Sequence, residues 1–349
     1  MPYSGTKVYF DGSHYIAIPH TTRPPRRSRK VIDEDILEVD NNSLPLPENE
    51  EKQPTKEELE NEINFDDFTE ASEEDNKVFE EMEPSKPETV KISRRELFDK
   101  FYMQSLDLPK KKRKKAILEL MRPYFKKENQ DSLESYVTRQ IERREKNMAA
   151  RRTRCYRKAN LQDFNYFVTF TYSNEKHTEE SFRKKLTIYL NNKSSRNGWK
   201  YIGVWERSPE NQRLHFHGIF YIPEGTMPGI ITQVNDYSFK SHNRQITMQN
   251  SYFLQNFGRN DFEVIEDKML LSQSLIYIMK YIEKSGEKLV YSRGLYQYFI
   301  SDIMDDDVIC TCGLEDKKLL LYDKFQCLND GEYVGEVSKE TISKMPKSN

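Results

Sequence analysis

Alternating apolar and polar residues mark the best-defined part of the chain, which lies in its second half. Residues 166–172 (YFVTFTY) alternate aromatic and β-branched side chains with threonine, a pattern that predicts a strand. Two further strand-length runs, residues 201–206 and 214–221, flank the polar turn at residues 208–212 and predict a β-hairpin. Between the first strand and the hairpin, a helix is expected to start near Thr178.

The order strand, helix, strand, strand is the first half of a split β-α-β arrangement. We therefore predict an α+β fold, in which an antiparallel sheet is flanked by helices. Apolar residues at helical spacing predict further helices at 94–107, 113–127, 132 to about 158, 250–256 and 271–284, the last ending at Gly286. Shorter apolar runs predict strands at 7–18 around an Asp-Gly turn, 237–248 (with His242), 262–265, 319–322 and 333–337, strand or loop at 290–300, and a loose tail from Ser338.

Charge divides the chain into blocks that its net charge of -2 conceals. An N-terminal hairpin and basic linker at 1–30 precede an acidic segment at 31–90, which we expect to be mostly disordered with a short helix near 57–63. A basic helical region then occupies 91–160, the sheet domain occupies 161–300, and a C-terminal extension occupies 301–349. The acidic segment is either a plain spacer or a shield that keeps basic surfaces from nonspecific contacts.

Basic residues are dense in the helical segments that precede the sheet. One cluster is the uninterrupted run Lys110–Lys115 (KKKRKK), and a second includes Arg143, Arg144, Arg151, Arg152, Arg154, Arg157 and Lys158. Charge of one sign at this density repels itself unless a polyanion neutralises it. These clusters favour nucleic-acid binding over a merely solvated helical face, although alone they would support only nonspecific binding.

Composition argues against a membrane or secreted protein. The sequence contains no apolar run long enough to span a membrane and no apolar signal core at its N-terminus. Its four cysteines lack the spacing of paired CxxC motifs, which indicates a reducing compartment. Cys310 and Cys312 have only Cys327 nearby, so no zinc site is expected there. The sequence therefore predicts a soluble intracellular protein with no membrane partner.

The most informative run is RLHFHGIFY, at residues 213–221, which carries two histidines one residue apart. In a strand, residues i and i+2 face the same side, so His215 and His217 project together. Two neutral imidazoles are half of a divalent-metal site, and Glu206 on the other arm of the hairpin is placed to complete it. The alternative is that these are ordinary histidines on a half-buried strand.

The helix predicted at 271–284 carries a second pattern. Tyr277 and Tyr281 are four residues apart, and so are Lys280 and Lys284. Residues at this spacing share one helical face, so both phenols can face the same cleft, each followed by a lysine three residues later. Tyrosines at this spacing are also common core residues of amphipathic helices, and the spacing alone does not separate the two interpretations.

In chain order, the strand at 167–172, the set Glu206, His215 and His217, and the run YIMKYIEK at 277–284 together resemble the HUH endonucleases. These are the replication initiators of rolling-circle plasmids and single-stranded-DNA phages. The resemblance covers residues 165 to about 295. It implies that the histidine pair and Glu206 are metal ligands and that both tyrosines and both lysines belong to the two-tyrosine motif of phage-type initiators.

This resemblance implies a metal-dependent enzyme that nicks and rejoins single-stranded DNA at a replication origin. Mn²⁺ or Mg²⁺ would polarise the scissile phosphate, and a tyrosine would attack it to form a 5′-phosphotyrosine. The neighbouring lysines are expected to help lower the phenol pKa. The implied partners are single-stranded and duplex origin DNA and a host helicase and polymerase, in the cytoplasm of a bacterial host.

Two alternatives stay open. A relaxase or transposase of the same class would share the chemistry and differ in its biology. A noncatalytic DNA-binding regulator would retain only a degenerate sheet domain, and an intact ligand set with both tyrosines argues against it. Within the resemblance, we expect Tyr281 to attack first and Tyr277 to serve the second transfer.

Overall fold

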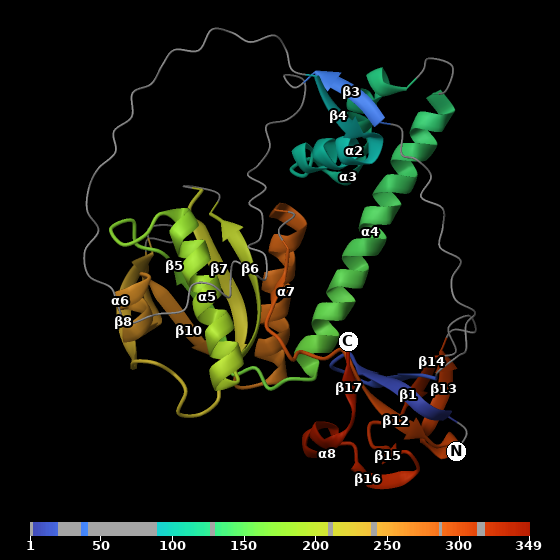
Figure 1. The fold of residues 1–349 in the computed structure, drawn as a ribbon, viewed down its shortest axis with the longest axis vertical. Coiled ribbons are helices and arrows are strands. Elements are labelled where there is room, and N and C mark those ends of the chain that lie inside the picture. Colours follow the sequence, from blue (N-terminus) through green and yellow to red (C-terminus); the bar gives the residue numbers. More distant parts are fainter. Residues whose placement is uncertain are drawn as a thin grey trace. The chain divides into compact units, whose positions relative to one another are not determined.

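The structure is a computed structural model that describes residues 3–19, 36–40, 89–125, 130–208, 212–238, 243–285, 288–312 and 318–349 (Figure 1). Its internal contacts divide the chain into two compact units, and the boundary falls within the long helix α4 (Gln130–Asn160). One unit contains residues 1–26 and 144–349, and the other contains residues 27–143. The larger unit therefore includes both ends of the sequence.

Within its described residues, the larger unit contains a five-stranded antiparallel sheet. The strand order is β10 (Asn260–Val264), β5 (Tyr166–Thr171), β7 (Leu214–Tyr221), β6 (Lys200–Arg207) and β11 (Val290–Tyr291). Strands β6 and β7 pair along their whole length, from Lys200 opposite Tyr221 to Arg207 opposite Leu214. The predicted hairpin and the predicted α+β class with an antiparallel sheet are confirmed.

Helices pack against both faces of this sheet because its strands carry apolar side chains on both sides. Helix α5 (Glu179–Asn197) begins at the predicted cap Thr178, and its apolar face joins a largely aromatic cluster that includes Phe170, Phe182, Trp199, Tyr201, Phe216 and Phe220. Helix α7 (Lys268–Ser285) packs on the other face, in a cluster that includes Ile202, Val204, Ile219, Leu275 and Ile278. The sheet is therefore buried on both sides over most of its area.

Two glycines face each other where aromatic rings cross the hairpin. Gly203 of β6 is paired with Gly218 of β7. A Cβ atom on Gly203 would lie 2.2 Å from Cζ of Phe216, and one on Gly218 would lie 2.9 Å from Cε2 of Phe220. The two rings occupy the space that side chains would need, so only glycine fits these two positions.

The two ends of the sequence meet in a second sheet of the larger unit. Its order is β13 (Val308–Cys312), β14 (Lys318–Leu321), β2 (Tyr15–Ile18), β1 (Tyr3–Phe10), β12 (Tyr298–Ile303), β15 (Gln326–Asn329) and β16 (Glu332–Glu336), and β17 (Lys347–Ser348) also pairs with β12. Helix α8 (Lys339–Lys344) lies between β16 and β17, capped by Ser338. The expected loose tail is therefore wrong, because Ile342 and Met345 belong to the core of this sheet.

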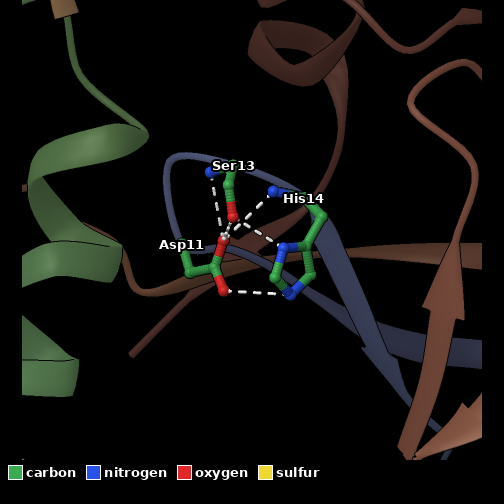
Figure 2. A network of polar contacts seen from close by, with 3 residues as sticks. All are labelled: Asp11, Ser13 and His14. Atoms are coloured by element: carbon green, nitrogen blue, oxygen red, sulfur yellow. Dashed lines mark hydrogen bonds and ion pairs between the residues drawn. The ribbon is translucent and has the colours of Figure 1, made fainter.

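The turn between β1 and β2 is held by Asp11 (Figure 2). Its carboxylate accepts hydrogen bonds from the backbone amides of Ser13 (3.2 Å) and His14 (3.1 Å) and lies 3.2 Å from Nε2 of His14. The Ser13 hydroxyl contacts both Asp11 (3.1 Å) and Nδ1 of His14 (2.6 Å). Burial opposes ionisation of Asp11, but the hydrogen bonds from His14 and Ser13 and the nearby His14 imidazole together outweigh it and lower the pKa of this carboxyl. The predicted strand pair around an Asp-Gly turn is confirmed, and the network clamps that turn.

The smaller unit packs helices and a strand pair around its own core. Strand β3 (Ile36–Asp40) pairs with β4 (Thr89–Ser93), so strands form near both ends of the segment expected to be mostly disordered. Residues 57–63, where a short helix is predicted, lie outside the described residues. Helix α2 (Arg94–Gln104) begins with a capping box between Ser93 and Glu96, and α3 (Lys110–Met121) leads into a short 3-10 helix at Arg122–Tyr124.

Part of the basic sequence is used for packing. In α3, Arg113 donates hydrogen bonds to the carbonyl oxygens of Ser105 (3.1 Å), Leu106 (2.6 Å) and Leu108 (3.1 Å), and so closes the turn that follows α2. In the last turns of α4, Arg157 lies 4.0 Å from the ring centroid of Tyr9. The buried Lys158 donates a hydrogen bond to the carbonyl oxygen of Leu295 (2.9 Å). The exposed basic residues of these helices include Lys111, Lys112, Lys115, Arg151, Arg152 and Arg154.

One predicted strand is replaced by a strand pair. Strands β8 (Ile231–Ser238) and β9 (Asn243–Asn250) form an antiparallel pair where a single strand is predicted at 237–248. The apolar residues of β8 recur every three positions rather than every two, so its sequence does not predict a strand. The predicted helix at 250–256 is confirmed as α6 (Ser251–Asn256). His242 and Gly286 lie outside the described residues.

In the part of the chain that the structure describes, no helix combines the length and the apolar character needed to cross a membrane.

The glycine pair gives a prediction about stability. Gly203→Ala places a methyl group where the Phe216 ring lies, so we expect it to lower the free energy of unfolding by about 1–3 kcal/mol. Combining it with Phe216→Leu shortens the side chain that would collide, so the losses are expected to be less than additive. Urea unfolding of the two single variants and the double variant measures this. Fully additive losses would show that the ring is not what excludes the side chain.

Candidate active site

The strand register places the predicted site residues in rows across one face of the five-stranded sheet. Residues directly opposite each other in paired antiparallel strands lie on the same side of a sheet. Two neighbouring rows result, Glu206–His215–Thr171 and Val204–His217–Thr169. Val204 belongs to the cluster that packs under α7, so both rows lie on the α7 face.

His217 and Glu206 are in direct contact on this face. Nε2 of His217 lies 2.8 Å from Oε2 of Glu206, and only 8% and 11% of the two side chains are exposed. A carboxylate buried to this degree needs polar partners to compensate for the water it loses. His217 supplies one of these partners, so the structure brings two of the three predicted metal ligands together.

A threonine holds the second ring nitrogen of each histidine. Oγ1 of Thr169 lies 2.9 Å from Nδ1 of His217, and Oγ1 of Thr171 lies 2.7 Å from Nδ1 of His215. At His215, a hydroxyl that accepts a hydrogen bond from Nδ1–H leaves the lone pair on Nε2, the arrangement that metal-binding histidines use. At His217, Nε2 faces the Glu206 carboxylate and carries the proton of the neutral ring, so the Thr169 hydroxyl donates to Nδ1. Binding an ion through this Nε2 would require the other tautomer of His217. The threonines of strand β5 are therefore site residues that the sequence analysis used only to predict a strand.

The surroundings of His215 keep its imidazole neutral. Burial lowers the pKa of His215 to about 4, and His217, Arg213 and Arg259 act in the same direction. A histidine must be neutral to coordinate a metal ion. His215 is therefore in the ionisation state that a ligand requires.

Helix α7 brings both tyrosines onto His217. The ring centroids of Tyr277 and Tyr281 lie 5.4 Å and 5.6 Å from that of His217, and 4.8 Å from each other. The Tyr281 ring is stacked on the imidazole with an interplanar angle of 10°, and its hydroxyl hydrogen-bonds with Glu206. The ring of Tyr277 also lies 5.5 Å from that of Phe167. The shared helical face predicted for the two phenols is thus turned toward the histidine pair.

The expected lowering of the phenol pKa is wrong for the structure as it stands. Burial raises the pKa of Tyr277, and burial together with the contacts to Tyr277 and Glu206 raises the pKa of Tyr281 well above its usual range. Lys280 is exposed, so water screens its charge, and the side chain of Lys284 lies outside the described residues. Both phenols are therefore protonated at neutral pH.

The chemistry of the donor set fits a divalent cation. Two imidazole nitrogens and one carboxylate oxygen are ligands that Mn²⁺ and similar ions accept, with coordination positions left for phosphate oxygens. The present geometry is not that of a metal centre, because no group of three His, Cys, Asp or Glu side chains in the described chain is arranged to hold an ion. The Glu206 carboxylate contacts His217 directly, so an ion would have to enter between them.

Strand β10 adds charged residues that the sequence analysis does not assign to the site. Asp261 is opposite Thr169 and Glu263 is opposite Phe167, so both lie on the α7 face. Asp261 accepts a hydrogen bond from the Met248 amide (2.8 Å). Burial and the nearby Asp261 raise the pKa of Glu263, and His217 acts against them. The alternating charges in β10 were visible in the sequence, but they become informative only once β10 is known to pair with β5.

A comparison with known families agrees with this assembly. Residues 165–286 match the family described as Replication-associated protein ORF2/G2P. The matched segment includes β5, the β6–β7 hairpin and α7, and so every residue placed together above. This part of the chain is therefore similar to replication-associated proteins. No curated protein and no solved structure gives a significant match.

The burial of His215 gives a prediction about pH. Its pKa is about 4 in the folded protein and 6.5 without these surroundings, so the unfolded chain takes up the proton first as the pH falls. We therefore expect the free energy of unfolding of the metal-free protein to decrease from pH 6.5 to about 4, and His215→Gln to remove part of this decrease. Urea unfolding followed by tryptophan fluorescence across this range measures it, with His177→Gln as the control. The same pH dependence in wild type and His215→Gln would contradict the assignment.

Proposed function

We propose that this protein initiates rolling-circle DNA replication by nicking one strand at an origin and later rejoining it. The observation that carries the proposal is the pair of α7 tyrosines whose rings lie on His217, beside the Glu206 carboxylate. Two nucleophiles next to a set of metal-ligand side chains are what a reversible phosphodiester transfer needs. The family match of residues 165–286 supports the same role.

Glu206, His215 and His217 are the residues that would hold Mn²⁺ or Mg²⁺. Such an ion, when bound, supplies positive charge that polarises the scissile phosphate. The side chains of the protein provide the positioning. Thr169 and Thr171 orient the two imidazoles through their Nδ1 atoms, and α7 holds the phenols over the histidine pair.

Tyr281 is better placed than Tyr277 to attack first. Its hydroxyl hydrogen-bonds with Glu206, whereas Tyr277 is 38% exposed and packs toward Phe167. As the bond between the Tyr281 oxygen and phosphorus forms, the P–O3′ bond breaks, leaving a 5′-phosphotyrosine and a strand with a free 3′-hydroxyl. The phenol passes its proton to Glu206, the carboxylate that its hydroxyl contacts, and the leaving O3′ takes up one proton, so the step consumes none overall.

The covalent link retains the energy of the phosphodiester bond, so rejoining needs no ATP. Tyr277, whose ring centroid lies 4.8 Å from that of Tyr281, would cut the regenerated origin while Tyr281 remains esterified. Lys280 and Lys284 would offset the charge of the DNA phosphates beside the two phenols. The free 3′-hydroxyl would serve a host polymerase, with a host helicase separating the strands ahead of it.

Origin DNA would meet the protein at two kinds of surface. The single strand would lie on the α7 face, where the histidines and tyrosines meet. Duplex DNA would be held by exposed basic residues, a set that excludes Arg113, Arg157 and Lys158 because these are used for packing. Each phosphate contact made by the remaining lysines and arginines would release counterions and make binding salt-dependent.

The tyrosine pair gives the prediction that tests this function. Tyr281→Phe removes only the attacking oxygen and keeps the ring against His217, so a loss of activity would not reflect lost packing. We expect this variant to form little covalent adduct with labelled single-stranded origin DNA in Mn²⁺. Tyr277→Phe is expected to form adduct in a single turnover but to fail to complete unit-length circles. Denaturing gels measure the adduct, and mass spectrometry of the nucleotide-linked peptide locates the bond.

Tyr296→Phe, outside α7, is the matched control and should leave adduct formation unchanged. A link found only on Tyr277 would reverse the order of the two tyrosines. If no nucleotide is found on either tyrosine, the proposed function is contradicted, and the two rings serve only to pack α7 against the sheet.

A further inference from the structure

Two arginines, Arg213 and Arg259, lie at one end of the five-stranded sheet. The proposed reaction gives neither of them a role. Arg259 directly precedes β10, and its carbonyl oxygen accepts a hydrogen bond from the Thr171 amide (2.8 Å). This bond continues the pairing of β10 with β5 and places Arg259 in the row of Thr171, His215 and Glu206. Arg213 directly precedes β7, two residues before His215.

The backbone that carries Arg259 is held tightly against β5. Gly258 has a φ of +140°, and a Cβ atom there would lie 2.5 Å from the Ser173 nitrogen and 2.7 Å from the Thr171 carbonyl oxygen. The Ser173 amide also donates a hydrogen bond to the carbonyl oxygen of Phe257 (2.9 Å). The backbone at Arg259 is therefore held in a fixed position, while the Arg259 side chain is exposed.

Arg213 is anchored differently at the same end of the sheet. Its guanidinium donates a hydrogen bond to the carbonyl oxygen of Tyr172 and lies 5.0 Å from the centroid of that ring. Arg213 precedes His215 by two residues and Arg259 lies in the row of His215, so both belong to the sheet face that carries the candidate metal ligands. A guanidinium held in this way presents several N–H donors in a planar fork, which matches the oxygens of a phosphate group.

The stereochemistry of phosphoryl transfer relates these arginines to the tyrosines. In an in-line displacement, the attacking and leaving oxygens lie on opposite sides of phosphorus. The Tyr281 hydroxyl reaches the row at its β6 end, where it bonds with Glu206. With the scissile phosphate beside His215, in the middle of this row, the leaving O3′ would point along the row toward β10. Since neighbouring strands are about 4.8 Å apart, Arg259 starts about 10 Å from His215, near enough for its side chain to reach the adjoining phosphates.

We propose that Arg213 and Arg259 bind backbone phosphates of the DNA strand upstream of the nick, the strand that carries the released 3′-hydroxyl. This inference rests on the proposed function and adds to it the direction in which the strand crosses the sheet. By holding the released strand, the two arginines keep its 3′-hydroxyl beside the phosphotyrosine. Rejoining then remains possible until a polymerase extends the end.

Oligonucleotides that end at the mapped cleavage position separate the two halves of the strand. One is the upstream product with a free 3′-hydroxyl, and the other is the downstream half. In fluorescence anisotropy, we expect Arg259→Gln to weaken binding of the upstream product about tenfold, as for the loss of one charge-assisted contact, and to leave the downstream half unaffected. Arg259→Gln is preferred to a variant of Arg213, because the Arg213 side chain also bonds the end of β5.

Two further variants control for charge and for position. Arg259→Lys keeps the positive charge and is expected to recover most of the upstream affinity. Arg207→Gln removes an arginine at the same end of the sheet that the Glu179 carboxylate already engages (2.7 Å), and is expected to affect neither oligonucleotide. In strand-transfer assays, Arg259→Gln should form adduct in a single turnover but release the upstream product faster and rejoin it less often.

The outcomes separate this inference from the function on which it rests. If wild type and Arg259→Gln both form adduct, but the variant loses affinity equally for both halves or for neither, the inference fails and the proposed function stands. Arg207 pairs with Leu214 and belongs to the opposite face of the sheet. If Arg207→Gln weakens upstream binding as much as Arg259→Gln, a position on the α7 face is irrelevant and the inference fails as well. If wild type forms no adduct, the proposed function and the inference both fail.

Discussion

The register between β6 and β7 is the constraint on which the rest of the site depends. Because side chains alternate between the two faces, a slip of one residue would turn the site residues of the slipped strand, either Glu206 on β6 or His215 and His217 on β7, from the α7 face into the aromatic core beneath α5. Gly203 and Gly218 oppose such a slip, since the rings that fill the space beside them would collide with any side chain moved there. The packing on one face of the hairpin therefore sets the position of the polar groups on the other.

Burial on the α7 face then determines the ionisation of the groups that lie there. It keeps the imidazole of His215 neutral and both phenols protonated, and it leaves Glu206 with His217 and Tyr281 as its polar partners. In such surroundings a phosphate or a divalent cation interacts more strongly with nearby charges than it would in water. Lys280, by contrast, is exposed, so water screens its charge and it has little influence on the pKa of the two phenols.

Local patterns in the sequence predict the hairpin, α5 and α7, because their strand and helix periods are regular. They also predict that His215 and His217 share a face, since this follows from spacing alone. They do not predict that β1 pairs with β12, because nothing in a local period specifies a partner at the other end of the chain. They likewise do not place Arg259 and Glu263 on the sheet face that carries the site, because that placement depends on the pairing of β10 with β5. Nor do they show that Arg113 closes a turn, because its hydrogen bonds depend on where the carbonyl groups of that turn lie.

The central claim is that Glu206, His215 and His217 form one metal site at which Tyr281 reacts. Diffraction from crystals grown with Mn²⁺, recorded near the manganese absorption edge, tests it directly. We expect an anomalous peak within about 2.5 Å of the Glu206 carboxylate and of Nε2 of both histidines, with the Tyr281 hydroxyl beside it and the direct contact between Glu206 and His217 opened. A Glu206–His217 contact that persists at saturating Mn²⁺, with no peak at this position, would contradict it.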